Sequence, residues 1–334
     1  MENPRKEEYL TKKISPFDIN KIKNTDDVLK SLKDCGFQGK NLGIAGDILY
    51  EMFKDETCLT ILTLSGAMIP AGMGKLISAL ADYKLVDVII STGANITHDL
   101  IDALLNGGHY QGNTEVNDED LFKHRINRIY DVFLPEDNYD RAEAELLTIL
   151  VELFPEKKLN LPPSEFLWYL GSKIKQKCIL SSASKNNIPI FIPAISDSEL
   201  ALNLLKFKET QGFEIEFRVL EDIKIFGEII KNAESCGTFI VGGGVPRNWA
   251  QQIYPYIENI ERISGKNIES GYKYSVRIHT AVELDGGLSG CTISESKSWG
   301  KYTIDSKYVS VWCDATIALP LLLTGVFERL ELIS

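Results

Sequence analysis

One short segment near the end of the chain brings together an acid, an aromatic ring and lysines. It reads Glu295-Ser296-Lys297-Ser298-Trp299-Gly300-Lys301. Most lysines are solvated surface charges, but an aromatic wall can desolvate an ammonium group and lower its pKa, which leaves a neutral, nucleophilic amine. Aromatic faces also attract alkylammonium ligands, and Glu295 could pair with a substrate amine or with Lys297. The segment therefore predicts a nucleophilic or amine-binding Lys301, and composition alone does not choose between these roles.

A glycine-rich turn, Gly242-Gly243-Gly244, follows an apolar run and is suited to a phosphate group. Consecutive glycines let the backbone approach a ligand and direct N–H groups at phosphate oxygens, although a tight strand-to-helix turn explains them equally well. The G-x-G-x-x-G pattern is absent, so a standard Rossmann dehydrogenase is not supported. Other runs end at Thr92-Gly93-Ala94, Asp197 and Asp314. An acid there can hold ribose hydroxyls or cap the next helix, and several such ends in one sheet favour a shared crevice.

The elements that must position these residues alternate between apolar, β-rich runs and helical runs. Strands are predicted at 58–64, 85–91, 188–195, 238–241, 274–280 and 308–313. Helices are predicted up to Tyr83, from about His98, from a cap at Asn138 or Asp140 through Phe154, and from Pro163 to about Gln176. We expect an α/β fold with a mostly parallel sheet, helices on both faces and a Rossmann-like, nucleotide-binding architecture. The predicted organisation is an arm at 1–36 and one domain at 37–334, with a helical excursion at about 109–186.

The composition narrows the class of protein and of partner. The chain has 334 residues and a net charge of −11, which argues against a nucleic-acid binder and leaves room for a cationic ligand. Its six cysteines are scattered without C-x-x-C or histidines at metal-ligand spacing, so no metal site is predicted. The sequence has neither a long apolar run nor the apolar centre of a signal peptide. It therefore predicts a cytoplasmic protein with no membrane partner.

Over roughly residues 40–330, motifs in order and at consistent separations resemble the deoxyhypusine synthase family. They include S-W-G-K-Y-T-I-D at 298–305, V-S-V-W-C-D-A-T-I-A-L-P-L-L at 309–322, T-A-V-E-L-D at 280–285 and the triple glycine. V-L-E-D-I at 219–223, Ser196-Asp197 and L-V-D-V at 85–88 extend the likeness.

This resemblance implies NAD chemistry joined to a lysine nucleophile. In the family, spermidine is oxidised beside its secondary amine, NAD takes the hydride, and an active-site lysine captures the imine while diaminopropane leaves. The aminobutyl group then passes to an acceptor amine and the hydride returns. In members that make hypusine, the acceptor is a lysine of a translation initiation factor. The expected partners are therefore spermidine or a related polyamine and, as one option, a protein lysine.

The resemblance also implies site residues. Lys301 matches the imine-forming lysine, Trp299 the aromatic wall over the polyamine, and Glu295 an amine-binding carboxylate. Asn248 and His98 fall on the substrate side. The positions that fall where the family contacts NAD are Ser65, Gly66, Thr92, Gly93, Ala94, Asp197, Gly242, Gly243, Gly244, Thr280, Ala281, Asp285, Asp314 and Ala315.

Several substrate-side positions depart from the pattern of hypusine-forming members. Asn248 replaces a His, Leu202 and Leu288 replace carboxylates, and His98 stands where a Glu is expected. A neutral Asn is a poor proton carrier near pH 7, and lost acids remove sites for ammonium groups. The cofactor and nucleophile residues thus match while the polyamine clamp differs. This pattern resembles the deoxyhypusine synthase-like branch of prokaryotes.

Two readings remain open beside protein modification, and a third lacks support. A homospermidine-type synthase would use a small amine as acceptor, and a non-catalytic homologue would only bind NAD or an amine. A sirtuin-like deacylase would need a catalytic His at a strand end and pairs of zinc-binding cysteines. The sequence offers no candidate for either feature. The resemblance further implies a homotetramer built from dimers, with active sites at the dimer interface.

Overall fold

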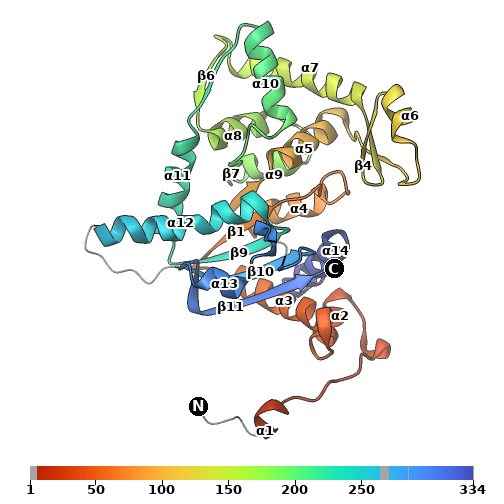
Figure 1. The fold of residues 1–334 in the computed structure, drawn as a ribbon, viewed down its shortest axis with the longest axis vertical. Helices are drawn as coiled ribbons and strands as arrows, with labels where there is room; N and C mark the ends of the chain where they lie inside the picture. Colours follow the sequence, from red (N-terminus) through yellow and green to blue (C-terminus); the bar gives the residue numbers. More distant parts are fainter. Residues whose placement is uncertain (1–5, 264–270, 285, 334) are drawn as a thin grey trace.

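The structure, a computed structural model, describes residues 6–263, 271–284 and 286–333 and is built on a six-stranded sheet (Figure 1). The strands lie in the order β11-β10-β9-β1-β2-β7, and each neighbouring pair is parallel. Their bounds are β1 (Cys58–Leu64), β2 (Val88–Ser91), β7 (Ile190–Phe191), β9 (Ser235–Val241), β10 (Tyr272–His279) and β11 (Tyr302–Trp312). The predicted α/β fold with a parallel sheet is confirmed.

The sheet is buried on both faces because its strands are apolar at consecutive positions, as parallel strands usually are. Along β1, Leu62 and Leu64 pack into the larger apolar core, while Ile61 between them packs into a second core on the opposite face. Leu49 belongs to the first core and Ala250 to the second. These residues lie on α3 (Phe37–Lys54) and α12 (Gly244–Ile263), which cover opposite faces of the sheet (Figure 1).

The strand order reverses direction at β1. From β1 the chain adds β2 and then β7 on one side, and afterwards β9, β10 and β11 on the other. In open α/β sheets, ligands bind outside the carboxyl ends of the strands at such a switch point. The place to expect a ligand is therefore the edge where β1 and β9 end.

The remaining helices surround this sheet. Their bounds are α1 (Lys6–Tyr9), α2 (Thr25–Lys33), α4 (Gly74–Asp82), α5 (Gly93–Leu105), α6 (Asp118–Lys123), α7 (Glu136–Leu153), α8 (Pro163–Lys173), α9 (Ile179–Lys185), α10 (Glu199–Thr210), α11 (Val219–Asn232), α13 (Ile293–Lys297) and α14 (Ala315–Arg329), with 3-10 turns η1 (Ile19–Lys21) and η2 (Leu288–Gly290). Although α2 lies within the predicted arm, it packs against α3 and α14 and its Leu29 is fully buried. Figure 1 shows the segment before α2 running away from the sheet.

The middle of the chain differs from the purely helical excursion that its polarity predicts. Short antiparallel strands β3 (Tyr110–Gln111), β4 (Ile126–Ile129) and β5 (Val132–Pro135) form a separate sheet, and β6 (Lys158–Leu161) pairs with β8 (Glu214–Phe217). Asn138 does not cap α7, because the helix already begins at Glu136 and the Asn138 amide donates to the Gly108 carbonyl oxygen at 2.9 Å. None of the helices in the described ranges is long and apolar enough to cross a membrane.

Candidate active site

Lys301 lies in a cavity of about 510 Å³ on the α12 side of the sheet. Four of the predicted site residues line it: Lys301, Trp299, Glu295 and Asn248. The other lining residues are Gln252, Pro255, Glu283, Gly286, Gly287, Leu288 and Cys291. The cavity is therefore formed by α12, by the segment that follows β10 together with α13, and by the residues just before β11.

The Lys301 side chain is buried at the wall of this cavity. It is only 9% exposed, and within the described part of the chain its ammonium group forms neither a hydrogen bond nor an ion pair. Nζ lies 5.8 Å from the centroid of the Trp299 ring. Burial lowers the pKa of Lys301, Arg247 adds to the effect, and Cys291 and Glu295 oppose it. Burial thus disfavours the charged form of Lys301, which is the direction that a nucleophilic amine would require.

Local backbone structure places the acid and the lysine on the same cavity. Thr292 caps α13 by accepting a hydrogen bond from the Glu295 N–H at 3.0 Å, which starts the helix beside the cavity. Gly300 has a φ of +66°, a value that side chains disfavour, and it turns the chain from α13 into β11. Lys301 thus immediately precedes β11, because that strand begins at Tyr302 rather than at the predicted Tyr308.

Two buried arginines tie the cavity wall to the glycine turn. Arg277 donates from Nε to the Gly242 carbonyl oxygen at 3.1 Å and from Nη1 to the Cys291 carbonyl oxygen at 2.9 Å. Arg247 donates from Nη1 to the Leu288 carbonyl oxygen at 3.3 Å. Within the described ranges neither guanidinium forms an ion pair with a carboxylate. Both positive charges near the cavity are therefore not neutralised by a direct partner. Burial and then the adjacent Arg247 lower the pKa of Arg277 to about 10.

The predicted cofactor residues lie at the carboxyl edge of the sheet, with a hydrogen-bonded turn at the switch point. Ser65, directly after β1, accepts a hydrogen bond from the Gly243 N–H at 2.8 Å and donates to the Val241 carbonyl oxygen at 3.1 Å. A Cβ at Gly243 would lie 2.9 Å from Oγ of Ser289. The glycine turn therefore contacts the same segment that walls the lysine cavity.

The end of β2 is equally compact. Thr92 caps α5, so this helix begins at Gly93 and not near His98. A Cβ on Gly93 would lie 2.4 Å from the Cβ of Ser198, so only glycine allows this approach to α10. Ala94 is exposed at the edge. Ser198, and not Asp197, caps α10, which leaves Asp197 exposed.

The other predicted positions occupy neighbouring strand ends or lie elsewhere. Gly66 follows Ser65 and Gly244 begins α12. Thr280 and Ala281 directly follow β10, whereas Asp285 is outside the described residues. Asp314 caps α14 by accepting from the Thr316 N–H at 2.8 Å, and Ala315 is the first residue of that helix. His98 does not line the lysine cavity but lies on α5 beyond the end of β2.

The sequence does not predict three residues at or beside the cavity: Arg247, Arg277 and Cys291. One signal was available, because Arg277 lies between the apolar residues Val276 and Ile278 of a predicted strand. Burying a charged side chain costs free energy unless hydrogen bonds or an opposite charge compensate it, so such a residue deserves a functional explanation. Cys291 carried no such signal, since its position in the cavity depends on how the segment after β10 folds back.

Comparison with known proteins places this arrangement in a family. The family model described as deoxyhypusine synthase matches residues 27–326. A "Probable deoxyhypusine synthase 2" of Archaeoglobus fulgidus is 39% identical over 294 residues, covering 87% of this chain and 94% of the relative. A "Deoxyhypusine synthase-like protein" of Chlorobaculum tepidum is 32% identical over 313 residues, covering 92% and 87%. The crystal structure of an Entamoeba histolytica protein, proposed to be a deoxyhypusine synthase, has the same fold at a TM-score of 0.63 and 19% identity, covering 94% of this chain and 97% of that one. The chain belongs to the deoxyhypusine synthase family, a family of transferases.

Proposed function

We propose that this chain is an NAD-dependent transferase that moves an aminobutyl group from spermidine or a related amine to an acceptor amine through an imine on Lys301. The observation that carries the proposal is a nine-tenths buried lysine without a charged partner, over an aromatic ring, in a cavity that also presents a carboxylate. Such a lysine is neutral more often than a surface lysine and can attack an electrophilic carbon. Glu295 would hold an ammonium end of the substrate, while Trp299 would cover its methylene chain.

Two observations support an NAD site at the carboxyl edge of the sheet. Oδ1 of Asn95, in the first turn of α5, is buried and accepts no hydrogen bond from the described residues. The Ser65–Gly243 turn lacks side-chain bulk where α12 begins, and helix N-termini attract phosphate groups. NAD bound at this edge would supply a reversible hydride acceptor for the carbon beside the secondary amine. The residues of the two turns would orient it, and Lys301 would hold the transferred group.

The proposal predicts a covalent adduct in the wild-type protein. Incubation with NAD and spermidine, followed by borohydride, should add a reduced aminobutyl group to Lys301, as read by peptide mass spectrometry. Omission of NAD should prevent the adduct, because the imine forms only after hydride transfer. If no common polyamine yields an adduct with NAD present, the transferase proposal is wrong.

The acceptor is identified in two reactions that both contain labelled spermidine. One reaction contains putrescine as the acceptor, and the other contains the initiation factor precursor. The small-amine acceptor of a homospermidine-type synthase is supported by Leu288, which gives the cavity an apolar wall where hypusine-forming members have a carboxylate. Label in homospermidine alone would favour that acceptor. Label confined to the protein band would favour modification of a protein lysine.

A substitution in the glycine turn tests the NAD assignment separately. Gly243→Ala should weaken NAD binding at least about tenfold, because the new Cβ would lie 2.9 Å from Ser289 Oγ and 3.0 Å from Arg277 Nη2 and must displace the turn. The matched control is Gly227→Ala on α11, whose Cβ would make an ordinary 3.5 Å contact with Ile253 of α12. Calorimetric titration with NAD measures both variants, and equal affinities would contradict the assignment.

A further inference from the structure

A buried arginine on α12 joins two of the segments that form the lysine cavity. Arg247 is only 2% exposed, and it donates from Nη1 to the Leu288 carbonyl oxygen at 3.3 Å and from Nη2 to Oγ of Ser296 at 3.2 Å. Leu288 begins η2 and lines the cavity, while Ser296 lies in α13. The guanidinium group therefore bridges η2 and α13, which are separated in the chain by Cys291 and Thr292.

The contact with Ser296 continues to the backbone of the aromatic residue and the lysine. The Ser296 carbonyl oxygen accepts hydrogen bonds from the Trp299 N–H at 3.2 Å and from the Lys301 N–H at 3.3 Å. Ser296 is fully buried, and its Oγ donates to the Thr292 carbonyl oxygen at 2.9 Å while it accepts from Arg247. One serine thus fixes the backbone that carries Trp299 and Lys301, and Arg247 holds that serine.

Fold stability does not explain why Arg247 is buried. Among the described residues no carboxylate pairs with its guanidinium group, and Nε is buried without a hydrogen-bond partner. Arg277 of β10, itself 1% exposed, brings a second positive charge close to it. A buried charge without an opposite charge costs free energy, and a well-packed apolar side chain would stabilise the fold better. The charge is therefore expected to serve the cavity that it adjoins.

Charged and titratable groups face Lys301 from several elements. Burial lowers the pKa of Lys301, and Cys291 opposes this shift. Arg247 lowers the pKa further, whereas Glu295 of α13 raises it. Glu283, in the segment after β10, also lines the cavity and carries a negative charge near neutral pH. Arg247 is the positively charged member of this set, so it acts together with burial to favour the neutral amine.

The neighbours of Arg247 on β10 and β11 do not cancel its charge. Burial, followed by Arg277 and Arg247, lowers the pKa of His279 to about 4, and burial raises the pKa of Tyr302. Both side chains are therefore uncharged near pH 7. On α12 itself, Glu258 faces the turn before β11 but is exposed to water, which screens it. The positive charge of Arg247 thus acts on the lysine amine without a compensating buried anion among these neighbours.

We propose that Arg247 is a positioning residue for Lys301: it holds η2 and α13 together around the cavity and places a fixed positive charge beside the lysine amine. This inference rests on the proposed function, in which the amine must be neutral to attack the donor carbon. Arginine suits the role because its guanidinium group stays protonated at every usable pH and its planar fork reaches two acceptors at once. The hydrogen bonds place the lysine backbone, and the charge favours the neutral side chain.

The reaction of Lys301 with acetic anhydride, followed from pH 6 to 11 by peptide mass spectrometry, tests the charge without requiring transferase activity. In Arg247→Gln the rate constant at pH 7.5 should fall about 3- to 10-fold, because the ammonium form persists to higher pH once the positive charge is lost. Wild-type and variant rates should converge near pH 11, where the amine is neutral in both. The matched control is Arg262→Gln on the same helix, which should follow the wild-type profile, since Arg262 contacts Asn259 on the exposed surface.

The hydrogen bond to α13 is tested by Ser296→Ala, which removes one oxygen atom and keeps the charge of Arg247. Hydrogen exchange of the Trp299 and Lys301 amides should become about tenfold faster, because the segment is no longer held to α12. Formation of the Lys301 adduct with NAD and spermidine should slow about 3- to 10-fold at every pH. In Arg247→Gln the loss should be larger at pH 7.5 than at pH 10, whereas a merely structural role would give equal losses at both.

The outcomes separate this inference from the transferase proposal. If wild-type protein forms no adduct with any common polyamine, the proposed function fails, while the acetylation profile still reports how Arg247 acts on Lys301. If Arg247→Gln shows the wild-type acetylation profile, the inference is wrong. If Arg247→Gln does not fold, Ser296→Ala decides, and amide exchange equal to that of the wild type would overturn the inference.

Discussion

Replacement of Lys301 by arginine is expected to abolish the borohydride-trapped adduct and to lower turnover by at least about 10⁴-fold. Arginine keeps a cation over the Trp299 ring, so the electrostatic contact remains. A guanidinium group stays protonated at every usable pH and cannot form an imine with the donor carbon. The adduct is measured by mass spectrometry and turnover by release of diaminopropane.

Lys297→Arg is the matched control for this change. Lys297 lies in the same segment, with Nζ 4.9 Å from the centroid of the Tyr308 ring, but it donates to the Ile304 carbonyl oxygen and does not line the cavity. It should retain activity near the wild-type level. NAD affinity should remain unchanged in Lys301→Arg, because that side chain is separate from the strand-end turns. Wild-type turnover in Lys301→Arg would mean that this lysine is not the nucleophile.

The sequence predicts the bounds of β1 well, because a central strand covered on both faces is apolar almost throughout. β1 spans Cys58–Leu64 as predicted, because it lies between β2 and β9. β7 contains only Ile190 and Phe191 of the predicted 188–195, since an edge strand pairs on one side. β11 begins at Tyr302, six positions before the predicted start at Tyr308. Its first half is mostly polar or exposed, so the pattern does not reveal it, yet it still pairs with β10.

Some contacts of the candidate site can be predicted from the sequence, and others depend on how distant segments fold. Trp299 and Lys301 are close in sequence, so their contact follows from local geometry and could be predicted. The contact between His98 and His109 depends on the left-handed turn at Asn106, which no periodic pattern indicates. Arg277 illustrates a third case, because its charge is visible in the sequence while its carbonyl partners depend on how the segment after β10 folds.

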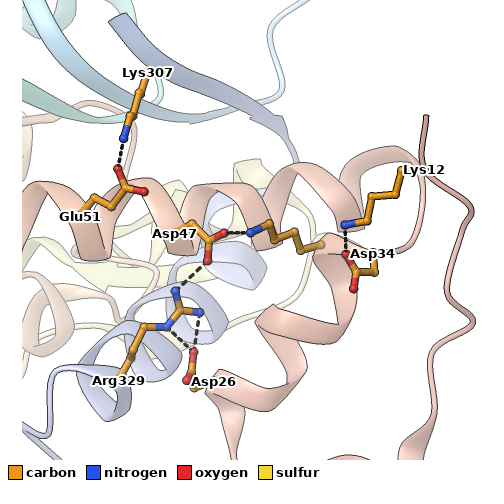
Figure 2. Close-up of polar contacts among 8 residues, drawn as sticks. Lys12, Asp26, Asp34, Asp47, Glu51, Lys307 and Arg329 are labelled. Atoms are coloured by element: carbon orange, nitrogen blue, oxygen red, sulfur yellow. Dashed lines mark hydrogen bonds and ion pairs between the residues drawn. The ribbon is translucent and has the colours of Figure 1, made fainter. Parts of the chain in front are cut away.

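Arg329→Met is expected to destabilise the protein by about 3–5 kcal/mol, the usual cost of removing one partner from a buried ion pair. Arg329 joins three helices: it donates from Nε to Oδ1 of Asp26 on α2 at 2.6 Å and from Nη1 to Oδ1 of Asp47 on α3 at 2.8 Å (Figure 2). Methionine keeps much of the length but leaves Asp26, only 5% exposed, with the more exposed Lys30 as its cation. The free energy of unfolding, from urea titration, measures the effect.

The exposed pair Lys307–Glu51, also drawn in Figure 2, supplies the matched control. Lys307→Met should leave the free energy of unfolding close to the wild-type value, because both side chains are about half exposed to water, which screens the pair. Equal losses in the two variants would mean that burial of the Arg329 network adds nothing to stability.

The pH dependence of the Arg329→Met effect provides a second check. Burial alone would raise the pKa of Asp47, but hydrogen bonds from Lys33 and Arg329 outweigh it and hold the pKa below its ordinary 3.8. A carboxyl group with a lowered pKa stabilises the folded state above its unfolded pKa and loses that contribution as pH falls through the folded pKa. The difference in unfolding free energy between wild type and Arg329→Met should therefore be constant near neutrality and shrink below pH 3.8. A difference that grows on acidification would contradict an electrostatic origin and would assign the loss to side-chain packing instead.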